Sequence, residues 1–217
     1  ADRARQLPVD GREVVVTPNG IELEQPPAPL DLRDHLGIDP AAPLVGTISR
    51  LVPQKAPEDF VAACAVVAAR VPDARYVLIG GGELEGEVEG AVDRERLRDR
   101  FHRIAELPGA SGVLGQLDVF CLSSRFEGGP YSPLEAMRAG TAVALTAVVG
   151  SRDVVEHGVT GLVVPPGDPA ALGGAIAELL DDPALRDRVA RAGQAQVAAR
   201  YDVRAMGAAL DALFARL

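Results

Sequence analysis

The chain has 217 residues, of which 47% are hydrophobic, 24% charged and only 4% aromatic, and it contains no tryptophan. This composition is typical of a globular protein whose core is filled mainly by Ala, Val and Leu. The formal net charge is −9, and no basic stripe is present. Because nucleic-acid binders take most of their affinity from Lys and Arg on phosphates, the charge argues against a DNA or RNA partner.

The cysteines and the polar N-terminal residues bear on the cellular setting. Cys64 and Cys121 each lie in an apolar run, so we expect both to be buried, reduced thiols. No stretch is as long and apolar as a membrane span, and the first residues do not resemble a signal peptide. The sequence therefore predicts a cytoplasmic protein with no transmembrane segment.

Strand-like and helix-like segments alternate along most of the chain. A short β-type run at 13–16, an Asn19-Gly20 turn and a Pro-rich connector at 24–30 lead to one or two helical turns at 31–36. Strands are expected at 44–48, 75–79, 101–104, 118–122, 141–146 and 161–164. Helices are expected at 57–71, 84–99, 132–139, 169–180, 183–200 and 203–217, with one helical turn at 152–157.

This order predicts the fold class. Strands that alternate with helices form parallel βαβ units with right-handed crossovers. The strands are apolar throughout, as expected when helices cover both faces of a sheet. The predicted fold is therefore α/β, a Rossmann-like doubly wound parallel sheet with helices on both faces. Ligands of such sheets bind beyond the carboxyl ends of the strands, so we expect the functional residues on the loops that follow strands.

Two cations stand on the loop that follows the strand at 44–48. Arg50 and Lys55 are five residues apart on a loop anchored by Pro53. A guanidinium and an ammonium group placed in this way can hold a diphosphate between them. The alternative is an ordinary pair of solvated surface charges, and at this point both interpretations stay open.

A Gly-rich loop follows the strand at 118–122 and leads into a helix. Gly128 and Gly129 would let the backbone approach a ligand closely or take a positive φ. Ser132 and Pro133 are residue types favoured at the N-cap and the first position of a helix. The free N–H groups at such a helix start form an anion site.

Two carboxylates flank this loop. Glu127 precedes the glycines and supports no obvious secondary structure, which favours a role in binding. Glu135 has two interpretations, because Ser132 and Glu135 have the spacing of a capping box. In that alternative the glutamate only closes the N-terminus of the helix.

Other glycine segments are less specific. The glycines at 80–82 follow a strand, but Glu85 stands where the dinucleotide-binding fingerprint needs its third glycine. His157 lies in a glycine-bounded turn, and we expect a solvated turn residue rather than a catalytic one. The sequence contains no Walker A loop, no HExxH motif and no DxD metal clamp.

Taken together, the motifs resemble the C-terminal lobe of the GT-B retaining glycosyltransferases, the glycosyl transferases group 1. The match runs in order across nearly the whole chain. Its segments are Pro18-Asn19-Gly20-Ile21, Ser49-Arg50-Leu51-Val52-Pro53-Gln54-Lys55, Ile79-Gly80-Gly81-Gly82, Asp118-Val119-Phe120 with Ser123-Ser124, the E-x7-E pair Glu127 and Glu135, and Glu156-His157-Gly158-Val159-Thr160-Gly161 followed by Pro165-Pro166-Gly167-Asp168.

The resemblance implies roles for the charged residues. Arg50 and Lys55 would hold the diphosphate of a UDP- or GDP-linked sugar donor. Glu127 would contact the sugar hydroxyls, and Glu135 would hold the ribose hydroxyls. Negative charge grows on the leaving oxygen during transfer, and cations and a helix N-terminus aimed there stabilise it. The resemblance therefore implies neither a metal ion nor a cofactor.

It also implies roles for backbone amides and a domain organisation. Amides around Gly128, Gly129 and Leu134 would meet the sugar and the phosphates. Residues 1–42 would form the interlobe connector and linker, and residues 43–200 the nucleotide-sugar-binding domain. Residues 201–217 would form a helix that returns toward an N-terminal, acceptor-binding lobe absent from this chain. Without that lobe, the acceptor site and full activity would be missing.

The sequence departs from the family pattern near the expected sugar pocket. Ala56 replaces the glycine that usually follows the lysine, and Arg152 and Asp153 replace a proline and a glutamate. Two other functions also stay open. One is a non-catalytic nucleotide-binding or scaffolding module of the same fold, with Glu135 serving only as a capping residue. The other is a sugar-nucleotide epimerase.

Overall fold

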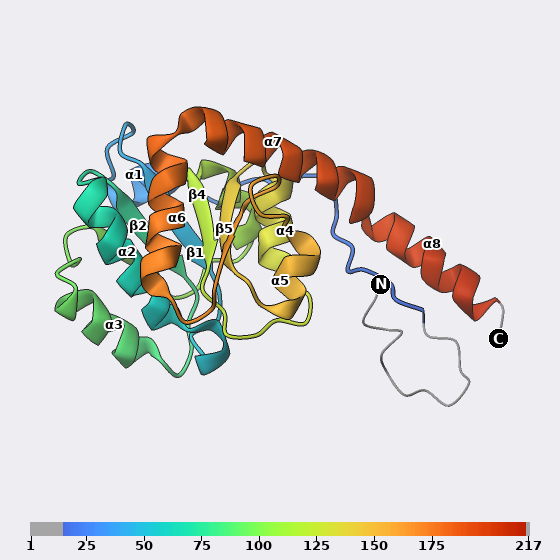
Figure 1. The fold of residues 1–217 in the computed structure, drawn as a ribbon, viewed down its shortest axis with the longest axis horizontal. Helices are drawn as coiled ribbons and strands as arrows, with labels where there is room; N and C mark the ends of the chain where they lie inside the picture. Colours follow the sequence, from blue (N-terminus) through green and yellow to red (C-terminus); the bar gives the residue numbers. More distant parts are fainter. Residues whose placement is uncertain (1–14, 216–217) are drawn as a thin grey trace.

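A computed structural model describes residues 15–215 of the chain, which form one sheet with helices around it (Figure 1). The six strands all run parallel in the order β3-β2-β1-β4-β5-β6. They are β1 (Leu44–Ile48), β2 (Arg75–Ile79), β3 (Phe101–Ile104), β4 (Val119–Leu122), β5 (Ala142–Thr146) and β6 (Leu162–Val164). The helices are α1 (Leu32–Leu36), α2 (Pro57–Arg70), α3 (Glu85–Arg94), α4 (Tyr131–Arg138), α5 (Val149–Val154), α6 (Pro169–Asp181), α7 (Pro183–Arg200) and α8 (Val203–Phe214), with two 3-10 helices, η2 (Pro53–Lys55) and η3 (Ala110–Gln116).

Two hydrophobic clusters cover the two faces of this sheet. Successive residues of a strand point to opposite faces, so Tyr76 and Leu78 of β2 join one cluster while Val77 and Ile79 join the other. Helices α2, α3 and α6 supply the first cluster, and α1, α4 and α5 supply the second. Helix α7 contributes to both, with Leu185 and Val189 in the first and Val197 in the second. The prediction of a doubly wound, Rossmann-like parallel sheet is confirmed.

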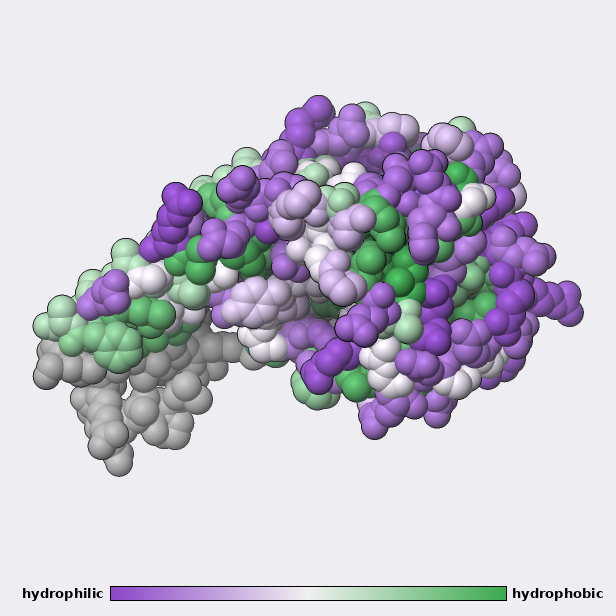
Figure 2. Space-filling model, turned by 180° about the vertical axis from the view of Figure 1, so that it is seen from behind, coloured by the Kyte–Doolittle hydropathy of each residue, from purple (hydrophilic) through white to green (hydrophobic). Residues whose placement is uncertain are grey.

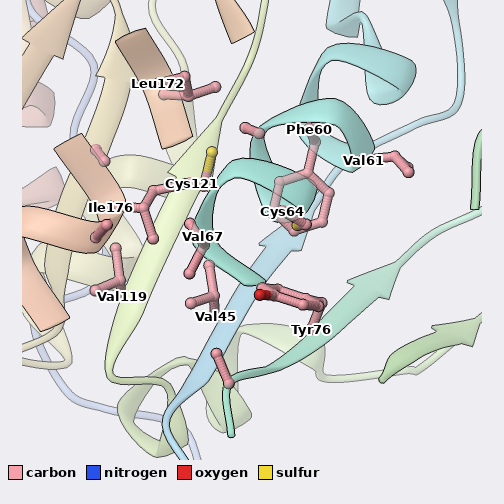
Figure 3. Close-up of a cluster of buried hydrophobic side chains, with 14 of the residues drawn as sticks. Val45, Phe60, Val61, Cys64, Val67, Tyr76, Val119, Cys121, Leu172 and Ile176 are labelled. Atoms are coloured by element: carbon pink, nitrogen blue, oxygen red, sulfur yellow. The ribbon is translucent and has the colours of Figure 1, made fainter. Parts of the chain in front are cut away.

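The first cluster contains both cysteines, between α2 and the sheet (Figure 3). Cys64 belongs to α2 and Cys121 to β4, and both are free and buried, as predicted. Burial raises the pKa of each thiol well above its ordinary value, because a thiolate would be poorly solvated there. Both side chains therefore act as small apolar residues in the core.

The predicted helix at 84–99 is too long. Helix α3 ends at Arg94, because Arg96 takes a left-handed conformation with φ of 57° and the Leu97 N–H donates to the Val92 carbonyl at 3.0 Å. This reversal satisfies the end of the helix and turns the Leu97 side chain into the core. Because glycine is the usual residue at such a helix end, an arginine there gives no indication in the sequence that the helix stops.

Two other predicted elements also differ. Val15 and Val16 belong to no strand, and the rest of the run predicted at 13–16 lies outside the described residues. The helical turn predicted at 152–157 is displaced, since α5 ends at Val154 and Val155 is extended. The chain leaves the helix there because the Glu156 N–H is held by the Thr160 hydroxyl at 3.0 Å in the next turn.

Helix α8 continues from α7 away from the body of the domain (Figure 1). None of its residues is buried, and Phe214 near its end is 67% exposed. Figure 2 shows apolar surface along this helix. Within residues 15–215, no helix is long and apolar enough to cross a membrane. The division at 42 and 200 into connector, domain and returning helix stays a prediction.

Candidate functional site

The loops that follow β1 and β4 meet at one edge of the sheet. These strands are far apart in sequence but pair directly, with Val45 opposite Val119, so their carboxyl ends lie together. Two hydrogen bonds join the loops: the Arg125 N–H donates to the Gln54 carbonyl at 2.8 Å, and Gln54 Nε2 donates to the Phe126 carbonyl at 3.1 Å. The predicted cationic and Gly-rich loops are therefore parts of one surface.

Lys55 and Glu127 form an ion pair across these two loops. The distance from Lys55 Nζ to Glu127 Oε1 is 2.5 Å, and the two side chains are only 15% and 5% exposed. The hydroxyl of Ser124 donates to the same carboxylate oxygen at 2.6 Å. The group of Lys55, Ser124 and Glu127 is called the Lys55–Glu127 corner below. The structure thus brings together two of the predicted site residues.

Buried hydroxyls hold this corner from behind. Ser123 Oγ donates to the carbonyls of Lys55 and Ala56, each at 2.9 Å, which fixes the backbone of the β1 loop. Thr146 Oγ1 donates to the Ser124 carbonyl at 2.6 Å, which fixes the start of the β4 loop. Both serines stand in a segment that resembles the family, but no role was predicted for them. Their signal was a pair of hydroxyls directly after a buried apolar strand.

The departure at Ala56 leaves the loop intact. Ala56 takes a left-handed conformation with φ of 44°, which glycine adopts without strain and which explains why glycine is usual there. Its N–H donates to the Pro53 carbonyl at 3.2 Å, closing η2 just before α2 begins. Alanine therefore carries some backbone strain without moving Lys55 away from Glu127.

The Gly-rich loop is held by backbone contacts rather than by unusual dihedral angles. Neither Gly128 nor Gly129 takes a positive φ, so that part of the prediction is wrong. A Cβ on Gly128 would meet nothing within 4 Å, whereas one on Gly129 would lie 2.7 Å from Asn19 Nδ2. Asn19 Nδ2 donates to the Gly129 carbonyl, and the Gly150 N–H donates to the Glu127 carbonyl at 3.1 Å. Asn19 and Gly150 were not predicted as site residues.

Helix α4 begins one residue earlier than predicted and without a capping side chain. Pro130 is its N-cap, so Ser132 already lies inside the helix, and no side chain caps the helix start. The capping-box interpretation of Glu135 is therefore wrong. Within residues 15–215, no side chain accepts a hydrogen bond from the N–H groups at this helix start. The first N–H groups of α4 lie at the positive end of the helix dipole and are suited to an anion.

Glu135 lies one turn further along α4, at the wall of a cavity of about 680 Å³. Tyr131 and Arg138 of the same helix, Ser111 of η3 and the Pro-rich connector also line this cavity. Burial raises the pKa of Glu135 above its ordinary value, and the nearby Arg138 opposes that rise only in part. The cavity is called the Glu135–Arg138 pocket below.

Arg138 ties the connector to α4 at this pocket. The side chain is 9% exposed, and it donates from Nε to Gln25 Oε1 at 3.0 Å and from Nη1 to the Glu22 carbonyl at 2.9 Å. Gln25 Nε2 in turn donates to the Ser111 carbonyl at 3.2 Å. Within residues 15–215, the buried Nη2 has no partner. Sequence reasoning missed Arg138, although a charge beside the apolar Ala136 and Met137 was a signal.

Arg50 is not part of the Lys55–Glu127 corner. The residue is exposed, and its guanidinium forms no ion pair within the described residues. Its loop rests on the glycines at 80–82: the Leu51 N–H donates to the Gly81 carbonyl at 3.0 Å, and a Cβ on Gly80 would lie 2.1 Å from the Ser49 carbonyl oxygen. The lack of side chains at these glycines therefore lets the Arg50 loop pack directly against their backbone. The role predicted for Arg50 stays a prediction.

His157 occupies an exposed turn, as expected. Its Nδ1 accepts a hydrogen bond from the Val163 N–H at 3.0 Å, which closes the turn before β6.

Comparison with known proteins assigns this chain to a family. A family model described as glycosyl transferases group 1 matches residues 30–196, which include the Lys55–Glu127 corner and Glu135. The chain belongs to the glycosyl transferases group 1 family. This group 1 domain is 32% identical over 215 residues to a 2-deoxystreptamine N-acetyl-D-glucosaminyltransferase from Streptomyces fradiae, with 96% of this chain and 51% of the relative covered.

Solved structures agree with the assignment. Anabaena HepE in complex with UDP-glucose superposes with a TM-score of 0.84 at 25% identity, covering 91% of this chain and 56% of HepE. The isolated C-terminal domain of the group 1 protein LpcC from Francisella tularensis superposes with a TM-score of 0.73 at 22% identity, covering 85% of this chain and 100% of that domain. The group 1 domain spans about half the length of the curated relatives it matches. The predicted lobe of a GT-B fold is confirmed.

Proposed function

We propose that this chain is the donor-binding lobe of a retaining glycosyltransferase. The enzyme would transfer a sugar from a UDP- or GDP-linked donor to an acceptor, without a metal ion or a cofactor. The observation that carries the proposal is the meeting of Lys55, Glu127 and the uncapped start of α4 at one edge of the sheet. A cation and free N–H groups at one place suit a leaving diphosphate, whose negative charge grows during transfer.

The diphosphate, the sugar and the ribose of the donor would each contact different residues of the site. Lys55, with Arg50 on the same loop, would bind the diphosphate together with the amides of Ser132 and Leu134. Glu127 would accept hydrogen bonds from the sugar hydroxyls. Glu135 would accept those of the ribose, because its carboxylate lines a pocket of about 680 Å³, within the range of ligand sites. HepE, described in complex with UDP-glucose, supports a UDP-linked donor.

The composition of the chain singles out Lys55. It is the only lysine, and every other basic side chain apart from histidine is arginine. A compact ammonium on a flexible stem differs from a planar guanidinium in the contacts it can make. The one lysine also stands on the loop where a phosphate would lie, which supports a specific role over solvated surface charge.

The acceptor would bind to a second lobe. The chain spans about half the length of its relatives, and the transferase named in Streptomyces fradiae is about twice as long as the matching part. Transfer would then occur in a cleft between the two lobes, whereas this lobe alone would bind nucleotide. No observation specifically favours the epimerase, and the loss of the capping-box interpretation removes the feature that favoured a non-catalytic module.

Calorimetry with UDP, GDP and ADP tests the proposal. We expect at least one of them to bind the 217-residue chain, and Lys55→Ala to weaken that binding about tenfold or more, since a charge-assisted contact is lost. Arg188→Ala, which removes an exposed cation on α7, is the matched control and should bind as the wild type does. The absence of binding by all three nucleotides at millimolar concentration would contradict the proposal.

A further inference from the structure

In the structure, Lys55 and Glu127 bind each other, although the proposed function needs them for different parts of the donor. The distance between the two charged groups is short and both side chains are largely shielded from water, so the pair differs from a solvent-exposed salt bridge. A diphosphate that approaches Lys55 must compete with the carboxylate for the ammonium group. One of the two side chains must therefore move when the diphosphate binds, and other contacts must hold the side chain that stays.

Glu127 has anchors that do not depend on Lys55. The Ser124 hydroxyl donates to Oε1, the same oxygen that Lys55 contacts, so the side chain keeps one donor if the ammonium leaves. Ser124 is fully buried and is itself held by Thr146. The backbone of Glu127 is fixed by the Gly150 N–H. Within residues 15–215, Oε2 has no hydrogen-bond partner, so this oxygen is available to a ligand.

Lys55 is held differently. Ser123 fixes its backbone carbonyl, but its ammonium contacts only Glu127 among the carboxylates of the described residues. Four methylenes link the ammonium to that backbone, so it can move between two acceptors without moving the loop. An arginine would bind a carboxylate through a planar fork and exchange less freely. The only lysine of the chain therefore stands where a mobile point charge is useful.

We propose that the donor diphosphate takes Lys55 from Glu127, and that Ser124 then holds the Glu127 carboxylate in place for the sugar. This inference rests on the proposed function and adds two statements to it. Glu127 is a competitor of the diphosphate for Lys55 as well as a partner of the sugar. Ser124 is a positioning residue that acts through Glu127.

The exchange predicts that removing the charge of Glu127 tightens the binding of a nucleoside diphosphate. In Glu127→Gln, Lys55 keeps a poorly solvated ammonium without its counter-charge, so UDP or GDP should bind about threefold more tightly or better by calorimetry. Glu58→Gln is the matched control, since it removes an exposed carboxylate from the start of α2 without touching Lys55. Equal tightening in both variants would mean general electrostatics and overturn the exchange.

The positioning role predicts a different change in Ser124→Ala. UDP affinity should stay within about twofold, while the ratio of UDP-glucose to UDP affinity should fall about threefold or more, because the carboxylate loses its remaining donor. GDP and GDP-mannose replace this pair if the wild type prefers guanine. Thr141→Ala also removes a buried hydroxyl, at the opposite end of β5 from Thr146, and touches neither Lys55 nor Glu127, so it should keep the wild-type ratio. An unchanged ratio in Ser124→Ala would overturn the positioning role.

The single lysine allows a direct observation. Selective ¹⁵N labelling of lysine gives one side-chain ammonium signal, which should shift when UDP or GDP binds but not when the nucleoside alone is added. If the wild type binds the diphosphate and this signal does not move, the exchange is wrong while the proposed function stands. If no nucleotide binds at all, both fall.

Discussion

The two ends of the proposed donor site are built on different plans. At the Lys55–Glu127 corner the charged groups are paired and hydrogen-bonded: Glu127 Oε1 accepts from both Lys55 and Ser124. At the Glu135–Arg138 pocket the charges are left partly unsatisfied, since burial raises the pKa of Glu135 and Arg138 Nη2 is buried without a partner within residues 15–215. A ligand at the corner must replace a partner, whereas a ligand in the pocket adds one.

This difference indicates how affinity would be distributed along the donor. Breaking a shielded ion pair offsets part of what a diphosphate gains at the corner. Filling a pocket whose polar groups lack partners relieves a desolvation cost that the protein already carries. One short helix links the two ends, because α4 follows the Gly-rich loop that begins at Glu127 and carries Glu135 and Arg138 to the wall of the pocket.

The largest effect on stability is expected at the corner. Lys55→Ala leaves the Glu127 carboxylate shielded and without its counter-charge, which should lower the free energy of unfolding by roughly 3 kcal/mol. The double variant Lys55→Ala/Glu127→Gln removes that charge as well and should recover most of the loss. Urea unfolding measures both. Equal losses in the single and double variants would show that the corner is not paired in solution.

A smaller loss is expected at the pocket. Arg138→Ala removes the hydrogen bonds to Gln25 and the Glu22 carbonyl, which should lower the free energy of unfolding by about 1–3 kcal/mol. Hydrogen exchange at the amides of residues 22–25 should speed up, because the connector loses its hydrogen bonds to α4. Arg138→Lys keeps the charge but cannot donate to both acceptors at once, so its free energy of unfolding should lie between those of the wild type and Arg138→Ala. Unchanged exchange in Arg138→Ala would mean that the prolines alone hold the connector.

The smallest effect has the opposite sign. The raised pKa of Glu135 means that the folded state favours the neutral acid, so the stability this carboxyl contributes is lost as the pH rises through that pKa. Glu135→Gln should therefore be slightly more stable than the wild type at neutral pH, by less than about 1 kcal/mol, and equal to it below the ordinary pKa of glutamate.

Thermal unfolding at several pH values measures this difference. The exposed Glu106→Gln is its control. A variant less stable than the wild type at neutral pH would show that Glu135 is already well paired. Nucleotide affinity should nevertheless fall in Glu135→Gln, because an amide is a weaker acceptor for ribose hydroxyls than a carboxylate.

Local patterns in the sequence were enough for the fold and for part of the site. Apolar runs of strand length between helical segments predicted the six strands of the sheet within one residue at each end, because burial on both faces makes each strand a continuous apolar run. The boundaries that failed, at α3 and α5, lie where a left-handed Arg96 and an extended Val155 end a helix without a glycine or a proline at the stop. Glu127 lies in the loop after β4 and Glu135 in α4, and their roles in binding stay predictions.

The sequence by itself determined the strand order in the chain, the residue types at the sheet edge and the family they resemble. Only the tertiary structure decided that Lys55 pairs with Glu127, that Gly80 and its neighbours seat the Arg50 loop, and that Arg138 holds the connector. These contacts depend on strands and loops that are distant in sequence and adjacent in the sheet. Local hydrophobic periodicity says which face of an element is buried, but it does not say which partner lies against it.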